Sequence, residues 1–145
     1  MADALLRSAT RSDVEALLAL WEVAAENDAR PVDTRAAVDR LLERDPQACL
    51  IVEQDGRIVG TVIAGWDGWR AHLYRLAVHP EVRRQGVGAA LLAAATERLV
   101  GLGATRLDAM VLEGNELGQS IWRAEGFTSQ EEWRRWVRPA GRANA

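Results

Sequence analysis

The 145-residue sequence contains no lysine, a single cysteine and no long apolar run. All 18 basic residues are arginines, so the chain offers no lysine side chain of its own for modification. One cysteine, Cys49, excludes an intramolecular disulfide and argues against a cysteine-based zinc site. No stretch approaches the roughly 18–20 consecutive apolar residues that span a membrane. These absences exclude a disulfide-stapled secreted domain and predict a protein without a membrane partner.

The remaining composition is that of one globular domain. With 48% hydrophobic and 27% charged residues, a chain of 145 residues can bury a sizeable core by itself. There is no internal repeat and no low-complexity linker, so we expect a single domain over residues 1–145. Residues 1–7 lack the basic start and apolar core of a secretory signal, which predicts a cytoplasmic protein.

The charges are divided unevenly along the chain. Residues 1–69 hold 7 arginines against 13 acidic residues, whereas residues 70–145 hold 11 arginines against 8 acidic residues. A basic C-terminal half suits an anionic ligand, and an acidic N-terminal half suits a cationic one. The net charge of −3 argues against a dedicated nucleic-acid-binding protein.

Hydrophobic periodicity predicts a mixture of strands and helices. Alternating or short apolar runs predict strands at residues 5–9, 48–53, 57–64, 72–78, 105–112 and 133–137. Helical spacing predicts helices after the capping-box sequence Thr10–Asp13, after Thr34, and at residues 86–100 and 115–124. Asp55-Gly56 predicts a tight hairpin turn. Because strands and helices neither alternate strictly nor segregate, we expect an α/β (α+β mixed) fold with one mixed sheet and helices on its faces.

Residues 76–89 carry the clearest chemical signal. A strand ends, a short loop contains Arg83 and Arg84, and Gly86 and Gly88 open a helix. The first N–H groups of a helix have no intrahelical partner, and the helix dipole adds partial positive charge there. Glycines let a bulky anion approach the backbone closely. We therefore predict a phosphate cradle, for which a diphosphate is the natural ligand.

Two other interpretations fit the same segment. Gly86-x-Gly88 matches the first half of a dinucleotide-binding fingerprint, although Leu91 stands where the third glycine belongs. Alternatively, a glycine-containing helix start with solvent-exposed arginines needs no ligand at all. A phosphate-binding loop of the Gly-Lys-Ser/Thr type is excluded because the chain has no lysine.

The pattern Arg83-x-x-Gly86-x-Gly88 after Leu76-Ala77-Val78 resembles the acetyl-CoA motif of the GCN5-related N-acetyltransferases. The downstream pattern Asn115-x-x-Gly118-x-x-Ile121-Trp122-x-x-x-Gly126-Phe127 is similar to the second signature of that family. Together with the order of elements, the resemblance covers nearly the whole chain. It implies the acyl-CoA N-acyltransferase fold, in which a single central mixed, mostly antiparallel sheet has a splayed strand pair and helices on both faces.

The resemblance also implies which residues bind acetyl-CoA, the one cofactor expected, with no metal. In this family the pantetheine arm lies between the splayed strands, where a backbone N–H stabilises the developing oxyanion. The loop and helix start hold the pyrophosphate, and an asparagine contacts the cofactor. Carried over position by position, the cofactor-binding residues are Leu76, Ala77, Val78, Arg83, Arg84, Gln85, Gly86, Val87, Gly88, Ala89 and Asn115.

The catalytic positions differ from two patterns of the family. Trp122 stands where many members have a tyrosine acid, and Met110 stands where the branch that acetylates ribosomal-protein N-termini has a glutamate base. His72 aligns with the strand position of the glutamate base in the histone-acetylating branch, and an imidazole titrates near ~6.5. Tyr74 lies two residues further and shares the strand face of His72. His72 is the candidate base and Tyr74 the candidate acid; an exposed histidine at the start of the strand and a packing tyrosine are the alternatives.

Tryptophans and acidic residues predict the character of the acceptor site. Trp21, Trp66 and Trp69 flank the region where this family binds the acceptor, and loop tryptophans can wall a pocket. Acidic residues that lie nearby in the sequence and suit a cationic amine are Glu22, Glu26, Asp28 and Asp67.

Two further tryptophans lie in the last expected strand. Trp133 and Trp136 differ by an odd number of residues, so they face opposite sides of a strand. One of them can pack in the core, and the other can meet a partner subunit or rest against a helix. A monomer and a homodimer therefore both stay open.

The sequence as a whole predicts an acetyl-CoA-dependent N-acetyltransferase. We expect direct attack by a primary amine of a small molecule, peptide or protein in a ternary complex, because no activated cysteine and no Ser/His/Asp set is present. A catalytically degenerate acyl-CoA sensor is the alternative that the departures at Met110 and Trp122 leave open. A dinucleotide-binding oxidoreductase is a second alternative.

Overall fold

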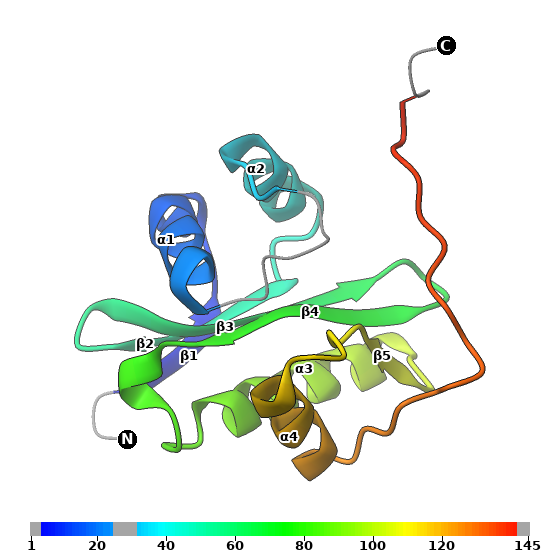
Figure 1. Cartoon of the computed structure of the whole chain (residues 1–145). Helices are drawn as coiled ribbons and strands as arrows, with labels where there is room; N and C mark the ends of the chain where they lie inside the picture. Colours follow the sequence, from blue (N-terminus) through cyan, green and yellow to red (C-terminus); the bar gives the residue numbers. More distant parts are fainter. Residues whose placement is uncertain (1–3, 25–31, 142–145) are drawn as a thin grey trace.

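The computed structural model describes residues 4–24 and 32–141 and has a single sheet covered by helices on both faces (Figure 1). The five strands lie in sequence order and are β1 (Ala4–Ser8), β2 (Cys49–Gln54), β3 (Arg57–Trp66), β4 (Ala71–Val78) and β5 (Leu107–Ala109). Neighbouring strands are antiparallel except for β4 and β5, which are parallel. The predicted fold class is confirmed, because the sheet is mixed and mostly antiparallel.

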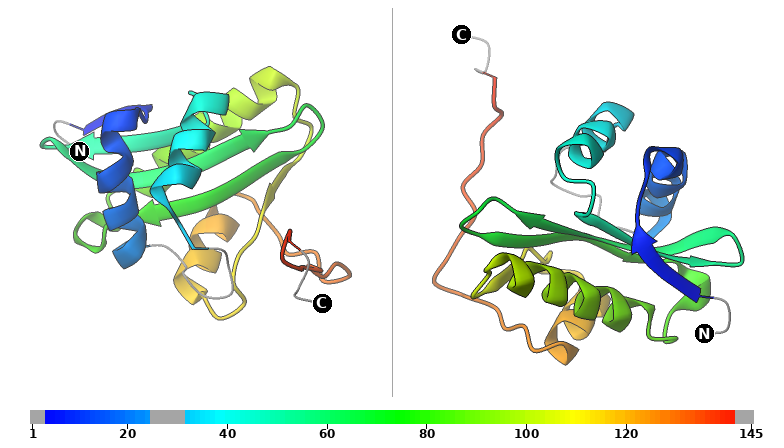
Figure 2. Two further views of the ribbon diagram at one scale, coloured as in Figure 1. Left: turned by 90° about the horizontal axis from the view of Figure 1, so that it is seen from above. Right: turned by 180° about the vertical axis from the view of Figure 1, so that it is seen from behind.

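The helices divide into two layers. Two views show α1 and α2 over one face of the sheet and α3 and α4 over the other (Figures 1 and 2). The helices are α1 (Val14–Ala24), α2 (Arg35–Arg44), α3 (Val87–Leu102) and α4 (Glu116–Ala124), and two short 3-10 turns are η1 (Arg11–Asp13) and η2 (Pro80–Val82). None of the helices in the described ranges is long and apolar enough to cross a membrane.

Several local signals of the sequence form the structures they predict. The Thr34 side chain caps α2 by accepting the N–H of Ala37 at 3.1 Å. Asp55 and Gly56 turn the β2–β3 hairpin with φ angles of +52° and +75°. Of the two glycines that follow residue 100, Gly101 lies within α3, and Gly103 ends the helix with φ +116°, a left-handed conformation that glycine adopts without steric cost. These signals act within a few residues, which is why the sequence alone locates them.

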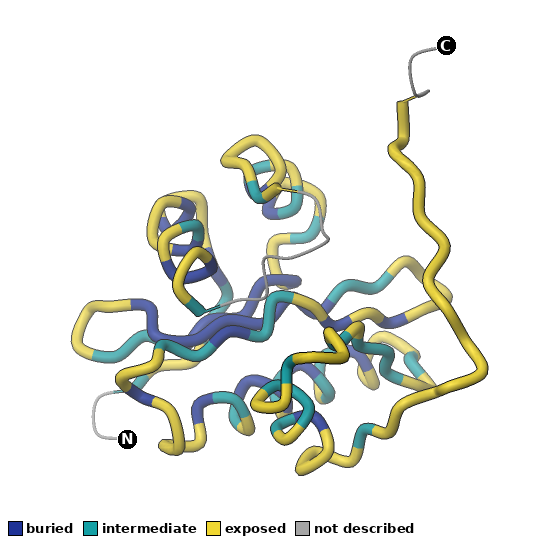
Figure 3. The backbone as a smooth tube through the Cα atoms, in the orientation of Figure 1, coloured by how far each residue is buried: buried dark blue, intermediate teal, exposed yellow. Residues whose placement is uncertain are grey.

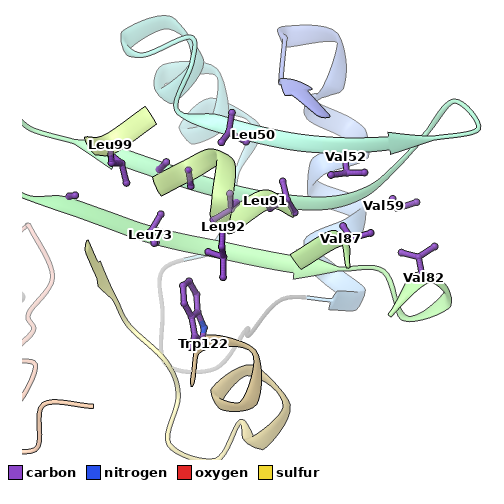
Figure 4. Packing of buried hydrophobic residues seen from close by; sticks show 14 residues of the cluster. Leu50, Val52, Val59, Leu73, Val82, Val87, Leu91, Leu92, Leu99 and Trp122 are labelled. Atoms are coloured by element: carbon purple, nitrogen blue, oxygen red, sulfur yellow. The ribbon is translucent and has the colours of Figure 1, made fainter. Parts of the chain in front are cut away.

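The core consists of two apolar layers that meet at the sheet. Residues 58–64 of the central strand β3 are all buried, because helices cover both of its faces (Figure 3). The layer on the α3 side, shown in Figure 4, contains Leu73, Leu91 and Leu92 together with Trp122 from α4. The layer on the other side contains Val14, Leu17 and Trp21 from α1 and Val38 and Leu42 from α2.

The predicted strand at residues 133–137 is wrong. Residues 127–141 contain no helix or strand, and this segment runs past the sheet and away from it (Figures 1 and 2). Trp133 and Trp136 have 68% and 93% of their surface exposed, so neither packs in the core. Strand propensity reflects packing against neighbouring strands more than an intrinsic backbone preference, and this segment has no neighbouring strand within the described residues.

Gly60 couples β3 to the start of α3. A Cβ at position 60 would lie 2.5 Å from Cγ1 of Val87 and 3.0 Å from Cδ1 of Leu91. Since the β-branched Val87 cannot rotate freely away, we expect Gly60→Ala to lower the free energy of unfolding by about 1–3 kcal/mol. Urea denaturation measures this loss.

A double-mutant cycle tests the cause of that loss. Removing the colliding methyl groups with Val87→Ala in the Gly60→Ala background relieves the overlap, so the two substitutions together cost less than the sum of their separate effects. Strict additivity of the two changes contradicts the steric explanation.

Candidate functional site

β4 and β5 separate after a short parallel contact. Only Ala71–Leu73 of β4 pair with Leu107–Ala109 of β5, so the predicted strand over 105–112 is shorter than expected. β4 continues to Val78, whereas the chain after Ala109 leaves the sheet and leads to α4 (Figure 1). The edge of β4 over residues 74–78 thus loses its neighbour on that side, and this is the splayed strand pair that the resemblance implied.

A cleft of about 1420 Å³ lies along this gap. One end is lined by the loop before α3, the first turn of α3 and the α4 region, including Arg83, Arg84 and Asn115. The other end is lined by α1, α2 and the facing side of β4, including Trp21, Asp33 and Tyr74. Leu76 and Val78 lie between the two ends along β4. The cleft therefore connects an end with two arginines and a helix start to a second end lined by Trp21, Asp33 and Tyr74.

The end of the cleft that contains the two arginines is built from the start of α3. Gly86 is the residue before α3 and has φ +82°, and no side chain caps the helix there. The first intrahelical bond runs from the N–H of Ala90 to the Gly86 carbonyl at 3.0 Å, so the three N–H groups of residues 87–89 precede the helical ladder. Arg83 and Arg84 are exposed, and neither forms an ion pair with a carboxylate of the described residues. Uncapped N–H groups and unneutralised guanidinium groups together fit a diphosphate.

Most of the predicted cofactor residues line the cleft. The lining contains Leu76, Val78, Arg83, Arg84, Gly86, Val87, Gly88, Ala89 and Asn115. Ala77 and Gln85 are not part of it: Ala77 is 1% exposed and packs in the layer under α1, and Gln85 is exposed on the loop. A register shift between β3 and β4 reverses the alternation of side chains before Ala77, so Ala77 lies in the layer opposite to Leu73 while its main chain still borders the gap.

The second signature forms the start of α4. The Asn115 side chain accepts the N–H of Gly118 at 2.9 Å and so caps this helix. A Cβ at position 118 would lie 2.8 Å from Cγ of Asn115, which explains why a glycine follows the asparagine at this spacing. The Trp122 and Phe127 rings meet edge to face at 4.9 Å between centroids, and Trp122 is 8% exposed. The residue at the tyrosine position of the family is therefore part of the core.

A bulge in β4 marks the middle of the cleft. Thr61 pairs with Ala77 but Ile63 pairs with Tyr74, so two residues of β4, Arg75 and Leu76, oppose one residue of β3. Arg75 has φ +55°, an uncommon conformation for a residue other than glycine. The bulge turns the main chain at the point where β4 loses its neighbour.

Side chains from three elements hold this bulge. The buried Thr61 hydroxyl donates to the Arg75 carbonyl at 2.8 Å and accepts the Trp21 Nε1–H at 2.9 Å. The Arg75 guanidinium donates from Nε and Nη2 to Oδ1 of Asp33, at 3.1 and 2.8 Å, and lies 5.9 Å from the Trp21 ring centre. Sequence reasoning missed Thr61, Arg75 and Asp33. The one signal was Thr61, a hydroxyl in an otherwise apolar run.

The two predicted proton carriers occupy different positions. His72 and Tyr74 share one face of β4, since Ala71 and Leu73 point into the opposite layer. Tyr74 lines the cleft, whereas His72 is exposed beside β5, opposite Asp108, and is not part of the lining. A Cβ at position 65 would lie 2.8 Å from the Tyr74 hydroxyl, so this hydroxyl lies over Gly65. Burial raises the pKa of Tyr74, which keeps its hydroxyl protonated.

The predicted acceptor residues are only partly brought together. Trp21 lines the cleft, but Trp66 packs towards α3 near Gly103, and Trp69 is 81% exposed outside the lining. Asp67 accepts the N–H groups of Trp69 and Arg70, which lower the pKa of its carboxyl and fix its loop. Glu22 is exposed on α1 and is not part of the lining, whereas Glu26 and Asp28 lie outside the described residues. The structure instead adds Asp33 to this end of the cleft.

Two other observations bear on the chemistry. Cys49 is fully buried in β2, and burial raises the pKa of its thiol to about 12, so it stays a protonated core residue. Residues 4–24 and 32–141 contain no group of three or more side chains that could hold a metal ion.

The dinucleotide alternative does not fit the fold, because the sheet has one parallel pair and Leu91 is a fully buried core residue.

Comparison with known proteins agrees with this geometry. The profile of the acetyltransferase (GNAT) family matches residues 9–127. A Yersinia enterocolitica protein named as an acetyltransferase is 33% identical over 127 residues, which cover 87% of this chain and 89% of that protein. Ard1 from Thermoplasma volcanium has a TM-score of 0.76 at 20% identity, covering 88% of this chain and 84% of that one. AAC(6')-Iy was solved with the bisubstrate analogue CoA-S-monomethyl-acetylneamine. It has a TM-score of 0.74 at 20% identity, covering 94% of this chain and 99% of that one. The chain therefore belongs to the acetyltransferase (GNAT) family and is an acetyltransferase.

Proposed function

We propose that this acetyltransferase uses acetyl-CoA and transfers the acetyl group to a primary amine while both molecules occupy the cleft. The observation that carries the proposal is the uncapped start of α3, where three N–H groups stand beside Arg83 and Arg84, which pair with no carboxylate of the described residues. This arrangement fits the diphosphate of CoA. When bound, acetyl-CoA supplies a thioester carbonyl that an amine can attack.

The remaining cofactor contacts follow from the shape of the cleft. The N–H groups of residues 87–89 bind the diphosphate, and the two arginines add charge-assisted hydrogen bonds. Leu76 and Val78 offer main-chain groups to the pantetheine arm along the free edge of β4. Asn115 both caps α4 and borders the cleft, so its side chain orders the wall that faces this arm.

Direct attack by the amine is favoured over a covalent acetyl-enzyme. The single cysteine, Cys49, is fully buried in β2, and burial raises the pKa of its thiol, so it offers no thiolate. At the acceptor end, Tyr74 offers a protonated hydroxyl for the leaving thiolate, whereas His72 is further from the cleft lining. Before the amine attacks, its ammonium form loses a proton to solvent in the open cleft or to the His72 imidazole.

The experiment that tests this function has two steps. Equilibrium binding of acetyl-CoA to the full chain comes first, followed by CoA release measured against pools of amines: peptide N-termini, lysine side chains, polyamines, amino acids and aminoglycosides. An amine-free reaction is the control for thioester hydrolysis. We expect binding and release in the presence of one pool; a protein that binds no acetyl-CoA contradicts the proposal.

A second candidate function is an acyl-CoA sensor without turnover. Two observations favour it: Trp122 is built into the core at the position of the family's tyrosine acid, and Met110 is 59% exposed at the position of a glutamate base. Tight acetyl-CoA binding with no amine-dependent release in any pool supports the sensor. Release above the amine-free control excludes it.

A further inference from the structure

Thr61 is a polar side chain in the most buried strand of the protein. It is 0% exposed, and its neighbours on β3 from Ile58 to Ala64 are apolar or glycine. A buried hydroxyl is costly unless its hydrogen-bonding capacity is used. The Thr61 hydroxyl acts both as acceptor and as donor, since it accepts the Trp21 N–H and donates to the Arg75 carbonyl. The contact therefore joins α1, β3 and the bulge of β4 through one oxygen.

The orientation of the Arg75 carbonyl fixes the orientation of the next N–H. In a trans peptide bond the carbonyl and the following N–H point in opposite directions. The Arg75 carbonyl points towards Thr61 on β3, so the N–H of Leu76 points away from β3. On that side of β4 lies β5, and beyond Leu73 the two strands have separated. The Leu76 N–H therefore points into the gap that forms the cleft.

The same contacts keep an unfavourable backbone conformation in place. A residue other than glycine at φ +55° persists only where the surroundings hold it. Arg75 is held by its carbonyl through Thr61 and by its guanidinium through Asp33 and the Trp21 ring. Trp21 takes part in both contacts, through its N–H and through its ring. Without the Thr61 hydroxyl, nothing else described donates a side-chain hydrogen bond to the Arg75 carbonyl.

We propose that Thr61, oriented by Trp21, is a positioning residue that keeps the Leu76 N–H directed at the carbonyl oxygen of the bound acetyl group. This inference rests on the proposed function, because the Leu76 N–H needs an acetyl carbonyl to act on. Thr61 touches neither substrate; it acts through the Arg75–Leu76 peptide. The N–H it directs stabilises negative charge that develops on the oxygen during attack.

The test uses a signal from the bound thioester as well as the rate. Infrared difference spectra of carbon-13-labelled acetyl-CoA on the full chain report the carbonyl band, which moves to lower frequency when the oxygen accepts a hydrogen bond. We expect Thr61→Val to move this band back towards its position in solution and to lower kcat about 100-fold. The affinity for acetyl-CoA stays near wild type, since the cradle is untouched. Thr61→Ser keeps the hydroxyl and restores both the band and most of the rate.

Two further variants make the result specific. Thr96→Val is the matched control, because the Thr96 hydroxyl also donates to a main-chain carbonyl, that of Leu92 at 2.7 Å, but within α3 and away from the cleft lining. It leaves the band and kcat at wild-type values. Trp21→Phe removes the N–H that orients Thr61, and it shifts the band in the same direction as Thr61→Val but less.

The outcomes separate this inference from the proposed function. If the wild-type protein shows no carbonyl band of bound acetyl-CoA, the proposed function and the positioning role are both overturned. A hydrogen-bonded wild-type band that Thr61→Val retains, together with an unchanged kcat, overturns only the positioning role. If Thr61→Val does not fold, Trp21→Phe decides in its place: an unchanged band and kcat in that variant overturn the role of the pair.

Discussion

Gly88→Glu is expected to lower the affinity for acetyl-CoA about 1000-fold. A Cβ at position 88 would meet Cγ2 of Ile121 and of Val78 at 3.7 Å, which is ordinary contact, so the backbone accepts a side chain there. That side chain starts between the end of β4 and α4, in the lining of the cleft. Two unit charges of like sign about 4 Å apart repel by about 4 kcal/mol near a protein surface, and this is about three powers of ten in affinity. Equilibrium titration with acetyl-CoA measures the loss.

The matched control is Gly101→Glu. Gly101 lies in the same helix, and a Cβ there meets nothing within 4 Å. This variant adds the same charge and the same side chain at the opposite end of α3, so it keeps wild-type affinity. Circular dichroism on both variants checks that the helix is intact. If Gly88→Glu binds acetyl-CoA as well as Gly101→Glu does, the diphosphate does not bind at the start of α3.

The form of the helix start that we propose as the phosphate cradle was predictable because its signals are local. A left-handed φ at Gly86, a helix start without a capping side chain and two adjacent arginines all lie within a few residues of sequence. The same holds for the caps of α2 and α4 and for the Asp55-Gly56 turn. Each of these features depends on the chemistry of neighbouring residues, so no tertiary contact is needed to recognise it.

The centre of the cleft was not predictable in the same way. The contact between Trp21 and Thr61 joins residues 40 positions apart, and the ion pair between Asp33 and Arg75 joins residues 42 positions apart. Arginine is not a residue that signals positive φ, so nothing in the local sequence marks the bulge at Arg75. The wrong strand at residues 133–137 has the converse cause: its local pattern suits a strand, but no strand lies beside it in the described chain.

His72 and Tyr74 show what the alternation of side chains along a strand can and cannot predict. Alternation correctly assigned both residues to one face of β4. It could not tell where along the strand the cleft begins, because that depends on where β5 ends, at Ala109. The splay begins beyond Leu73, the last residue of β4 that pairs with β5, so Tyr74 borders the cleft and His72 does not. The pairing length of a short neighbouring strand thus distinguishes the two candidates.

Tyr74→Phe is expected to lower kcat by at least about 100-fold while the affinity for acetyl-CoA stays unchanged. The substitution keeps the ring that lines the cleft and removes only the hydroxyl over Gly65. Burial raises the pKa of this hydroxyl above its ordinary value, so it stays a proton donor for the leaving thiolate at neutral pH. In wild type, kcat falls at alkaline pH as the hydroxyl ionises. The variant lacks that decline, which a pH profile of kcat detects.

Gly65→Ala tests the position of the hydroxyl without changing its chemistry. The added Cβ would lie 2.8 Å from the Tyr74 oxygen, so the tyrosine side chain must shift away from β3. If the hydroxyl acts where it lies, Gly65→Ala lowers kcat in the same direction as Tyr74→Phe, and combining the two changes adds little to the loss. Independent, additive losses would mean that Gly65→Ala acts through the strand rather than through the tyrosine.

His72→Ala separates the remaining routes for the proton. A loss of kcat in His72→Ala, with none in Tyr74→Phe, assigns proton transfer to the histidine and requires the acceptor to reach beyond the cleft towards β5. A loss in Tyr74→Phe alone assigns the departing proton to the tyrosine and leaves the ammonium proton to solvent. If neither variant changes kcat/KM, no side chain of β4 carries a proton. Deprotonation then runs through water in the open cleft, and catalysis rests on holding the two substrates together and on the N–H group that the bulge directs.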